Sequence, residues 1–255
     1  MKDKPTRPAN TPADNNLFVI DDSSPQLSPS DRKNLLSVVM SLMYIARLTR
    51  PDILLPVTFL ASRVHCSTKQ DNVKLDRVLR YLQNTVNKQL IISCDKLELN
   101  CYCDASYGTH HDGKSHTGYI FKLGQSYLFA RSIKQKLTAL SSTDAEIIAA
   151  TSAATTATWL RELQNEILNS LPQFYCHSIV LYQDNKSGIW LATKPSKYRR
   201  SKHLLTKLTY LKDLHNQSIL KFVYLNTTEM KGDLLTKPLQ GSPFQKHTNS
   251  MMGQT

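Results

Sequence analysis

The spacing of apolar residues changes near residue 94, and no other feature of the sequence constrains the fold as strongly. Between Asp31 and Leu90, apolar residues recur every three or four positions, which is typical of helices that bury one face. After Cys94, apolar and polar residues alternate from Leu97 to Asp104, as they do in a strand with one buried face. The chain therefore combines a helical segment with a segment that contains a sheet.

The helical segment, residues 31–93, predicts three helices. Arg50-Pro51 ends the first helix and starts the second, because proline fits a first helical turn and disfavours helix in the residue before it. The second helix should run over residues 53–64, with a kink at Pro56. Residues 1–30 are rich in Pro, Asn, Ser and Asp, so we expect them to form a disordered tail or linker.

The segment that follows predicts a mixed α/β domain. A first strand ends at Asp104, and an antiparallel hairpin follows over residues 117–132, because a Gly-Gln-Ser turn separates its two apolar runs. Thr143 and Glu146 have capping-box spacing at the start of a long helix. The later predicted elements are a strand at 179–182, a short helix, a helix at 203–216, a strand at 219–225 and a helix at 229–236. We therefore expect a mixed five-stranded sheet flanked by helices and preceded by a small helical segment.

The chain is strongly basic, with 32 Lys and Arg against 20 Asp and Glu and a formal net charge of +12. This excess favours a polyanionic partner, and nucleic acid is the first candidate. Many soluble proteins are mildly basic for no special reason, so charge alone leaves both alternatives open. No apolar run approaches the roughly 18 residues of a membrane helix, and residues 1–16 lack the apolar core of a secretory signal. We therefore expect a soluble, intracellular protein without a membrane partner.

The cysteines and histidines do not predict a metal cluster. The five cysteines are odd in number and form no C-x-x-C pair, so neither a disulfide framework nor a zinc site is indicated. His110, His111 and His116 crowd one predicted loop and could bind a metal adventitiously. No cysteine or carboxylate pattern at ligand spacing completes a site there.

Four carboxylates stand at positions from which they could meet. Asp104 and Asp184 lie where predicted strands end, and ligands gather at that edge of an open α/β sheet. Glu146 lies in the first turn of the long helix, and Asp233 lies in the last predicted helix. Clustered carboxylates repel one another unless a cation neutralises them, and ligands that are all oxygen select Mg²⁺ or Mn²⁺. Two such ions about 3.5 to 4 Å apart promote phosphodiester cleavage.

Each of these residues also has an ordinary structural interpretation. Asp104 and Asp184 could cap turns, and Glu146 could serve only as the capping-box partner of Thr143. Asp233 could be a solvated residue of a short helix. The residues alone leave these alternatives open.

Four segments resemble, in the same order, the ribonuclease H domain of copia-type retrotransposon polyproteins. They are Tyr102-Cys-Asp-Ala-Ser106, Ala139-Leu-Ser-Ser-Thr-Asp-Ala-Glu-Ile147, Gln183-Asp-Asn-Lys-Ser187 and Gly232-Asp-Leu-Leu-Thr-Lys-Pro-Leu239. Upstream, Thr49-Arg-Pro-Asp-Ile53 and Arg77-Val-Leu-Arg-Tyr-Leu82 are similar to the segment that joins the reverse transcriptase of this family to its nuclease. The resemblance implies a ribonuclease H-like domain at residues 94–240, a connection segment at 31–93 and a C-terminal tail at 241–255.

The resemblance also implies a function and its residues. Asp104, Glu146, Asp184 and Asp233 would bind two Mg²⁺ (or Mn²⁺) ions and cleave the RNA strand of an RNA–DNA hybrid. The implied partners are that hybrid and the reverse transcriptase domain of the same polyprotein. The implied location is the cytoplasm, within a retrotransposon particle, or the nucleus. Nothing in the chain resembles the paired-aspartate turn of a polymerase palm, so it should not synthesise DNA by itself.

A basic run near residue 200 predicts contact with the phosphates of a hybrid, although a solvated loop would have the same composition. Its members are Lys194, Lys197, Arg199, Arg200, Lys202 and His203, with Lys207 and Tyr198 nearby. After His203 the chain loses the charged residues that normally follow in this family. One alternative is therefore an inactive, retrotransposon-derived remnant that binds nucleic acid or a polypeptide. Another, weaker alternative is DNA strand transfer of the integrase type.

Overall fold

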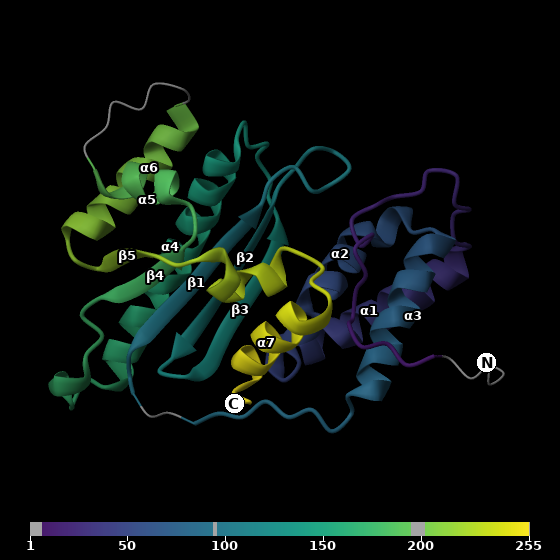
Figure 1. Ribbon diagram of the computed structural model, residues 1–255, viewed down its shortest axis with the longest axis horizontal. Coiled ribbons are helices and arrows are strands. Elements are labelled where there is room, and N and C mark those ends of the chain that lie inside the picture. The colour runs from purple at the N-terminus through teal and green to yellow at the C-terminus, as the bar shows by residue number, and fades with distance from the viewer. Residues whose placement is uncertain (1–6, 94–95, 195–201, 255) are drawn as a thin grey trace. The chain divides into compact units, whose positions relative to one another are not determined.

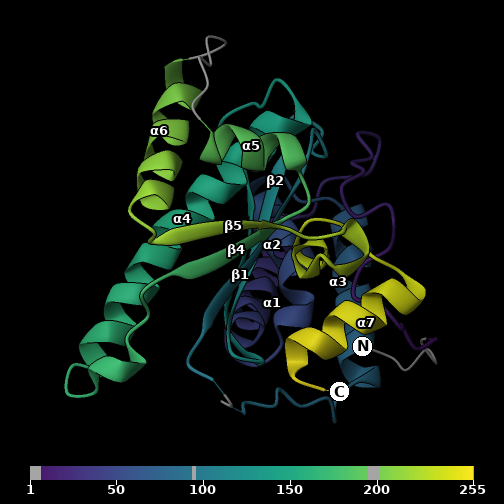
Figure 2. The same ribbon diagram turned by 60° about the vertical axis from the view of Figure 1, so that its left-hand side comes forward.

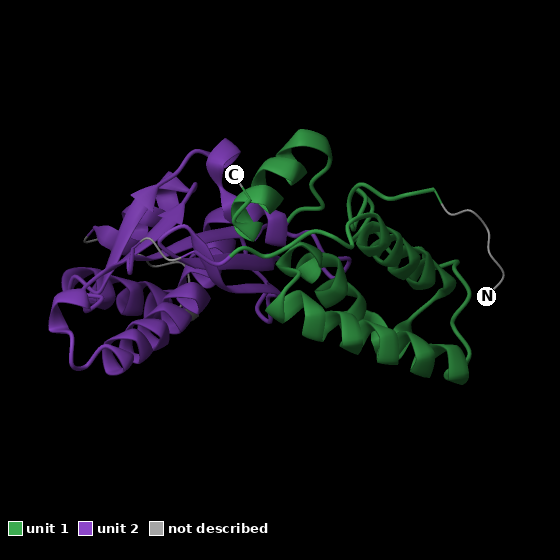
Figure 3. Ribbon diagram, turned by 90° about the horizontal axis from the view of Figure 1, so that it is seen from below, with its two compact units in different colours: residues 1–91, 237–255 green, residues 92–236 purple. Residues whose placement is uncertain are grey.

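The structure is a computed structural model that describes residues 7–93, 96–194 and 202–254. Its residues cluster into two compact units, which Figure 3 shows in different colours. Unit 1 comprises Met1–Ile91 and Lys237–Thr255, and unit 2 comprises Ile92–Thr236. Residues 237–255 thus group with the N-terminal helices, which the sequence did not lead us to expect.

The regular elements in the described part of unit 1 are helices. Its elements are α1 (Pro29–Leu48), η1 (Pro51–Ile53), α2 (Leu54–Arg63), η2 (Val64–Cys66), α3 (Lys69–Asn84) and α7 (Gly241–Met252). The three helices predicted for residues 31–93 are therefore confirmed. Pro56 lies in the first turn of α2, where a missing N–H interrupts no helical hydrogen bond, so it gives no reason for the kink we expected.

Residues 7–28 pack against the helices of unit 1, which differs from the disorder expected from their composition. Leu17 and Phe18 are buried, and the Phe18 ring meets Phe59 of α2 edge-on at a centroid distance of 5.5 Å. Arg77 of α3 donates hydrogen bonds to the carbonyl and hydroxyl oxygens of Thr11. A few apolar side chains and polar bonds to one helix hold this segment, and average composition does not reveal them.

The C-terminal segment, which the sequence predicts to be a tail, forms α7 and buries apolar residues. Phe244 meets the Tyr81 ring of α3 edge-on, with 5.8 Å between the ring centroids. Met251 and Met252 are fully buried, and the Met252 carbonyl accepts a 2.8 Å hydrogen bond from the N–H of Ile91. The apolar residues of α7 therefore complete the core of unit 1.

Unit 2 contains a mixed five-stranded sheet with the order β3-β2-β1-β4-β5 (Figure 1). The strands are β1 (Leu99–Ser106), β2 (His116–Leu123), β3 (Ser126–Lys134), β4 (Ile179–Gln183) and β5 (Leu220–Tyr224). β1, β2 and β3 pair in antiparallel fashion, whereas β4 pairs in parallel with both β1 and β5. This confirms the predicted fold class, a mixed five-stranded sheet flanked by helices and preceded by a helical segment.

Three helices lie on one side of this sheet, as the two views in Figures 1 and 2 show. They are α4 (Ser142–Ile167), α5 (Lys186–Thr193) and α6 (Lys202–Asn216). Ala149, Ala150 and Ala153 of α4 belong to one buried cluster with Cys101 and Cys103 of β1. Small side chains at this helix face allow α4 to approach the sheet closely, and this fixes the position of its first turn.

The segment after β5 forms two 3-10 turns instead of the helix predicted over residues 229–236. They are η4 (Thr227–Glu229) and η5 (Lys231–Leu235), and η5 packs against β1 and β2. Gly118 of β2 makes this contact possible, because a Cβ atom there would lie 2.7 Å from side-chain atoms of both Leu235 and Thr236. In the described part of the chain, no helix combines the length and hydropathy of a membrane span.

Candidate metal centre

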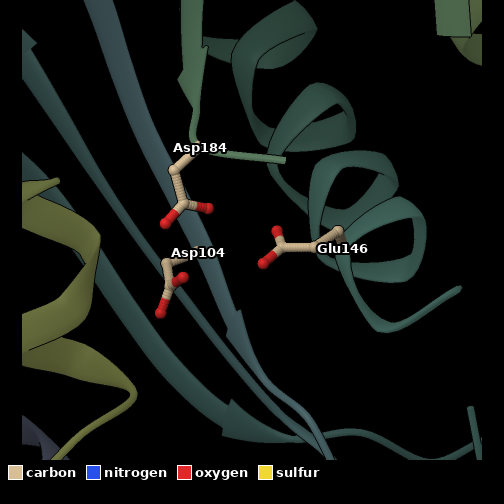
Figure 4. Close-up of side chains that lie close together, drawn as sticks. All are labelled: Asp104, Glu146 and Asp184. Carbon is tan, nitrogen blue, oxygen red and sulfur yellow. The ribbon is translucent and has the colours of Figure 1, made fainter. Parts of the chain in front are cut away.

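Three of the four predicted carboxylates converge in unit 2 (Figure 4). Each of Asp104, Glu146 and Asp184 offers an oxygen, and these oxygens all lie within 4.8 Å of one another. Asp104 is 1% exposed and Glu146 is 5% exposed, whereas Asp184 is half-buried. Glu146 and Asp184 follow Asp104 by 42 and 80 positions in the sequence, and the structure brings all three together, as predicted.

The parallel pairing of β1 and β4 brings the two aspartates together. Tyr102 stands opposite Tyr182 in the register, so Asp104 and Asp184 each follow this pair by two residues. Side chains two residues apart on a strand share one face, so both carboxylates point to the same side at the same level. Asp104 lies two residues before the end of β1, and Asp184 directly follows β4, so the sequence placed Asp104 slightly too near the strand end.

Glu146 enters from the other side, on the first turns of α4. The N-cap of α4 is Ser141, whose side chain accepts a hydrogen bond from the N–H of Asp144. The capping box that the sequence suggested between Thr143 and Glu146 is therefore wrong, because the helix begins two residues earlier than that pairing requires. The Glu146 carboxylate is thus directed to the sheet instead of to the helix end.

Two donors from the sheet hold the Glu146 carboxylate. The Ala105 N–H donates to one oxygen at 3.3 Å, and Gln183 Nε2 donates to the other at 2.8 Å. Burial raises the pKa of Glu146 well above its usual value, and the nearby negative charge of Asp104 raises it further. Without a cation, a negative charge on Glu146 is therefore unfavourable.

The aspartates are also held by hydroxyl groups. Thr236 donates a hydrogen bond to Asp104, and Thr227 donates one to Asp184 at 2.7 Å. Gln183 and Thr236 stand in the same sequence segments as Asp184 and Asp233, but the sequence predicted no role for them. Strand alternation places Gln183 on the same face as Leu181, toward α4, which is the signal that could have identified it.

The fourth predicted carboxylate, Asp233, lies in η5 on the other side of Asp104. It is buried, and its neighbour Gly232 lies so close to β1 that a Cβ atom there would be 3.0 Å from the Cβ of Asp104. Among the described residues, the carboxylates whose oxygens lie within 4.8 Å of one another are the other three, and Asp233 is not in that group. The backbone next to Asp233 therefore packs against Asp104, but the Asp233 carboxylate is not part of the three-residue cluster.

The three clustered residues fit a hard divalent cation. All their ligand atoms are carboxylate oxygens, which Mg²⁺ and Mn²⁺ prefer over nitrogen or sulfur. A cation among them would neutralise the charges that now oppose ionisation of Glu146. The donor set and its electrostatics therefore suit metal binding.

The structure describes little of the predicted basic run. Lys194 is exposed at the C-cap of α5. Lys197, Arg199 and Arg200 lie outside the described residues, and so do the side chains of Lys202 and His203 at the start of α6. Their role in nucleic-acid binding stays a prediction.

Comparison with known proteins places the chain beside retrotransposon polyproteins. It is 32% identical over 219 residues to the retrovirus-related Pol polyprotein from transposon RE1 of Arabidopsis thaliana, covering 84% of this chain and 14% of that polyprotein. It is 38% identical over 129 residues to the secreted RxLR effector protein 161 of Plasmopara viticola, covering 49% of this chain and 89% of that protein. No family model matches the chain.

Among solved structures, the chain is similar to the N-terminal ribonuclease H domain of a Mycobacterium tuberculosis protein, solved as a fusion with maltose-binding protein. The two chains share 11% sequence identity and a TM-score of 0.42, over 61% of this chain and 99% of the other.

Proposed function

We propose, from the premise that this chain is a homologue of copia-type retrovirus-related Pol polyproteins, that unit 2 is a metal-dependent endonuclease of the ribonuclease H type. Its substrate would be the RNA strand of an RNA–DNA hybrid. The observation that carries the proposal is the convergence of Asp104, Glu146 and Asp184 from three separate parts of the chain into one largely buried cluster. A cluster of this kind costs stability unless it binds a cation.

The carboxylates would hold two Mg²⁺ or Mn²⁺ ions, with Asp233 as the fourth ligand. The ions, when bound, supply activation of a water molecule and stabilisation of the leaving oxygen. The protein's part is to fix the ligands: Gln183 and the Ala105 N–H orient Glu146, and Thr236 orients Asp104. These bonds hold the oxygens in place before a substrate arrives.

Hybrid cleavage by the purified chain tests this proposal. When the RNA strand of a hybrid is labelled, incubation with Mg²⁺ should convert it to shorter fragments. The DNA strand should stay intact. Asp184→Asn and Glu146→Gln should each lower the rate at least about a hundredfold, because each removes a ligand that acts on the transition state. Glu162→Gln is the matched control, because Glu162 lies on the same helix but is exposed.

Three results would contradict the nuclease proposal. Cleavage that survives both substitutions would show that Glu146 and Asp184 are not ligands of the active centre. Tight hybrid binding without turnover in Mg²⁺ or Mn²⁺ would instead support an inactive, retrotransposon-derived remnant that binds nucleic acid. Activity on DNA but not on an RNA–DNA hybrid would support strand-transfer chemistry.

Several further expectations belong to the same proposal. Residues 31–93 would form a connection to a reverse transcriptase domain of the same polyprotein, which would be a partner of this chain. Residues 94–240 would form the nuclease domain. Lys194, Lys197, Arg199, Arg200, Lys202 and His203 would contact the phosphates of the hybrid. The protein would act in a cytoplasmic retrotransposon particle or in the nucleus.

A further inference from the structure

A chain of buried side chains in unit 2 links the loop before β2 to the backbone of η5. His110 Nε2 lies 2.9 Å from His116 Nδ1, and His116 Nε2 lies 2.7 Å from Ser132 Oγ. Ser132 in turn donates a 2.8 Å hydrogen bond to the carbonyl oxygen of Leu235. Both histidines and Ser132 are buried, so these bonds are shielded from water.

The direction of each bond follows from the number of protons available. Ser132 has one hydroxyl proton and gives it to Leu235, so its oxygen must accept from His116 Nε2–H. Burial lowers the pKa of His116 to about 3 and that of His110 to about 4, so both rings are neutral near pH 7. A neutral His116 that donates from Nε2 accepts at Nδ1, and His110 must then donate from Nε2. Every donor in the chain thus points toward η5.

The far end of this chain is a segment that contacts the carboxylate cluster. Leu235 lies between Asp233 and Thr236, and the Thr236 hydroxyl donates to Asp104. Leu235 and Thr236 also pack over Gly118 with no room for a Cβ atom. A displacement of the Leu235 carbonyl would therefore move both Asp233 and Thr236 relative to Asp104.

We propose that His116 is a positioning residue, which acts with His110 and Ser132 to hold η5 so that Asp233 and Thr236 are fixed beside Asp104. Its effect on cleavage rests on the proposed function, but its effect on η5 does not. Both ring nitrogens of His116 are engaged by His110 and Ser132, so this histidine is not available for the adventitious metal binding that the sequence suggested. His110 and His116 therefore act on the carboxylate cluster through the backbone of η5.

Hydrogen–deuterium exchange on the full chain, without metal or nucleic acid, tests the proposal directly. Ser132→Ala removes the bond to Leu235 with little change of volume, and His116→Phe keeps a ring but removes both nitrogens. In each variant, exchange of the amides of residues 231–236 should rise about tenfold, which is the scale expected for one lost buried hydrogen bond. Exchange in α4 and β4 should not change. His111→Ala is the matched control, because His111 lies in the same loop but is exposed.

Kinetics with the hybrid give a second, independent readout. In Ser132→Ala, kcat should fall about tenfold while KM changes less than about twofold, because a positioning defect lowers the rate of the chemical step more than substrate binding. Unchanged exchange at residues 231–236 in both variants would overturn the proposal, and so would a rise that is uniform across unit 2. Faster exchange at 231–236 in a chain that never cleaves a hybrid would refute the nuclease function and leave the positioning role intact.

Discussion

Asp104 and Glu146 are two acidic side chains placed side by side in a largely buried site. Burial and the charge of Asp104 both raise the pKa of Glu146, so the unliganded cluster opposes its own ionisation. Such an arrangement lowers the stability of the fold in return for affinity toward a cation. The consequences can be measured one residue at a time.

Asp104→Asn should raise the stability of unit 2 when no divalent ion is present. The substitution removes one of the three clustered carboxylates and allows the new amide to donate to Glu146, which should add about 1 kcal/mol to the free energy of unfolding. Mg²⁺ should raise the melting temperature of the wild type but not of this variant. A lower melting temperature of the variant in a chelator would show that the carboxylates do not repel each other.

The lowered pKa of His116 predicts how the free energy of unfolding depends on pH. Its pKa is about 3 in the folded chain against an ordinary value of 6.5, so below pH 6.5 the unfolded chain takes up a proton that the folded chain does not. The contribution of His116 to stability should therefore be constant above about pH 7 and fall as the pH drops toward about 3, with a slope of up to about 1.4 kcal/mol per pH unit.

Urea unfolding at several pH values, compared with His116→Phe, isolates this contribution. The carboxylates titrate in both proteins, so the difference between the two slopes belongs to His116 together with His110, whose ring it contacts at 2.9 Å. Equal slopes would mean that His116 is protonated as readily in the folded chain as in the unfolded one.

At the scale of elements, the contact between η5 and β2 requires a residue without a side chain at position 118, where the sequence has Gly118. Gly118→Ala would place a Cβ atom 2.7 Å from atoms of Leu235 and Thr236, and overpacking of this kind typically costs about 1 to 3 kcal/mol. Displacement of η5 should also lower the rate of hybrid cleavage. Gly188→Ala is the control, because the nearest atoms to its added Cβ lie at 3.5 Å, an ordinary contact. Equal loss of stability in both variants would argue against the tight packing of η5.

The elements differ in how far the sequence predicts them. The alternation that ends at Asp104 and the apolar run at residues 179–182 predict two strands, and their parallel pairing predicts the meeting of Asp104 with Asp184. Local spacing is sufficient there, because a strand alternates faces and a helix repeats every 3.6 residues. It is not sufficient for η5, which takes its shape from a contact with Gly118 more than a hundred positions away.

The supporting residues of the site are hidden from sequence for the same reason. Gln183, Thr236 and His116 act through hydrogen bonds to residues far along the chain. Their types are ordinary for strands and turns, so only the assembled sheet reveals what each one touches. The carboxylates were recognisable because each stands in one of four ordered segments that resemble a known family, and the residues alone left their role open.

At the scale of the whole molecule, unit 1 is built from two segments separated in the sequence by all of unit 2. Phe244→Ala should therefore destabilise unit 1, because the ring is buried against Tyr81, and should leave unit 2 unaffected. Loss of a buried phenylalanine typically costs about 3 to 5 kcal/mol.

Hydrogen–deuterium exchange resolved by segment gives the measurement. Protection should decrease in α1, α2 and α3 but not in the strands of unit 2. Gln245→Ala is the matched control on the exposed side of α7. Loss of protection in both units at once would mean that they unfold as a single cooperative body.

The insertion of unit 2 within unit 1 sets an order for folding on the ribosome. Strand β5 leaves the exit tunnel before α7 does, so the sheet can assemble while α1, α2 and α3 still lack the residues that close their core. The carboxylate cluster of unit 2 can therefore form in the nascent chain before unit 1 is complete, although most of unit 1 is synthesised first. Until α7 arrives, the ring of Tyr81 lacks its Phe244 neighbour, and a chaperone that recognises exposed aromatic side chains would meet this chain during that interval.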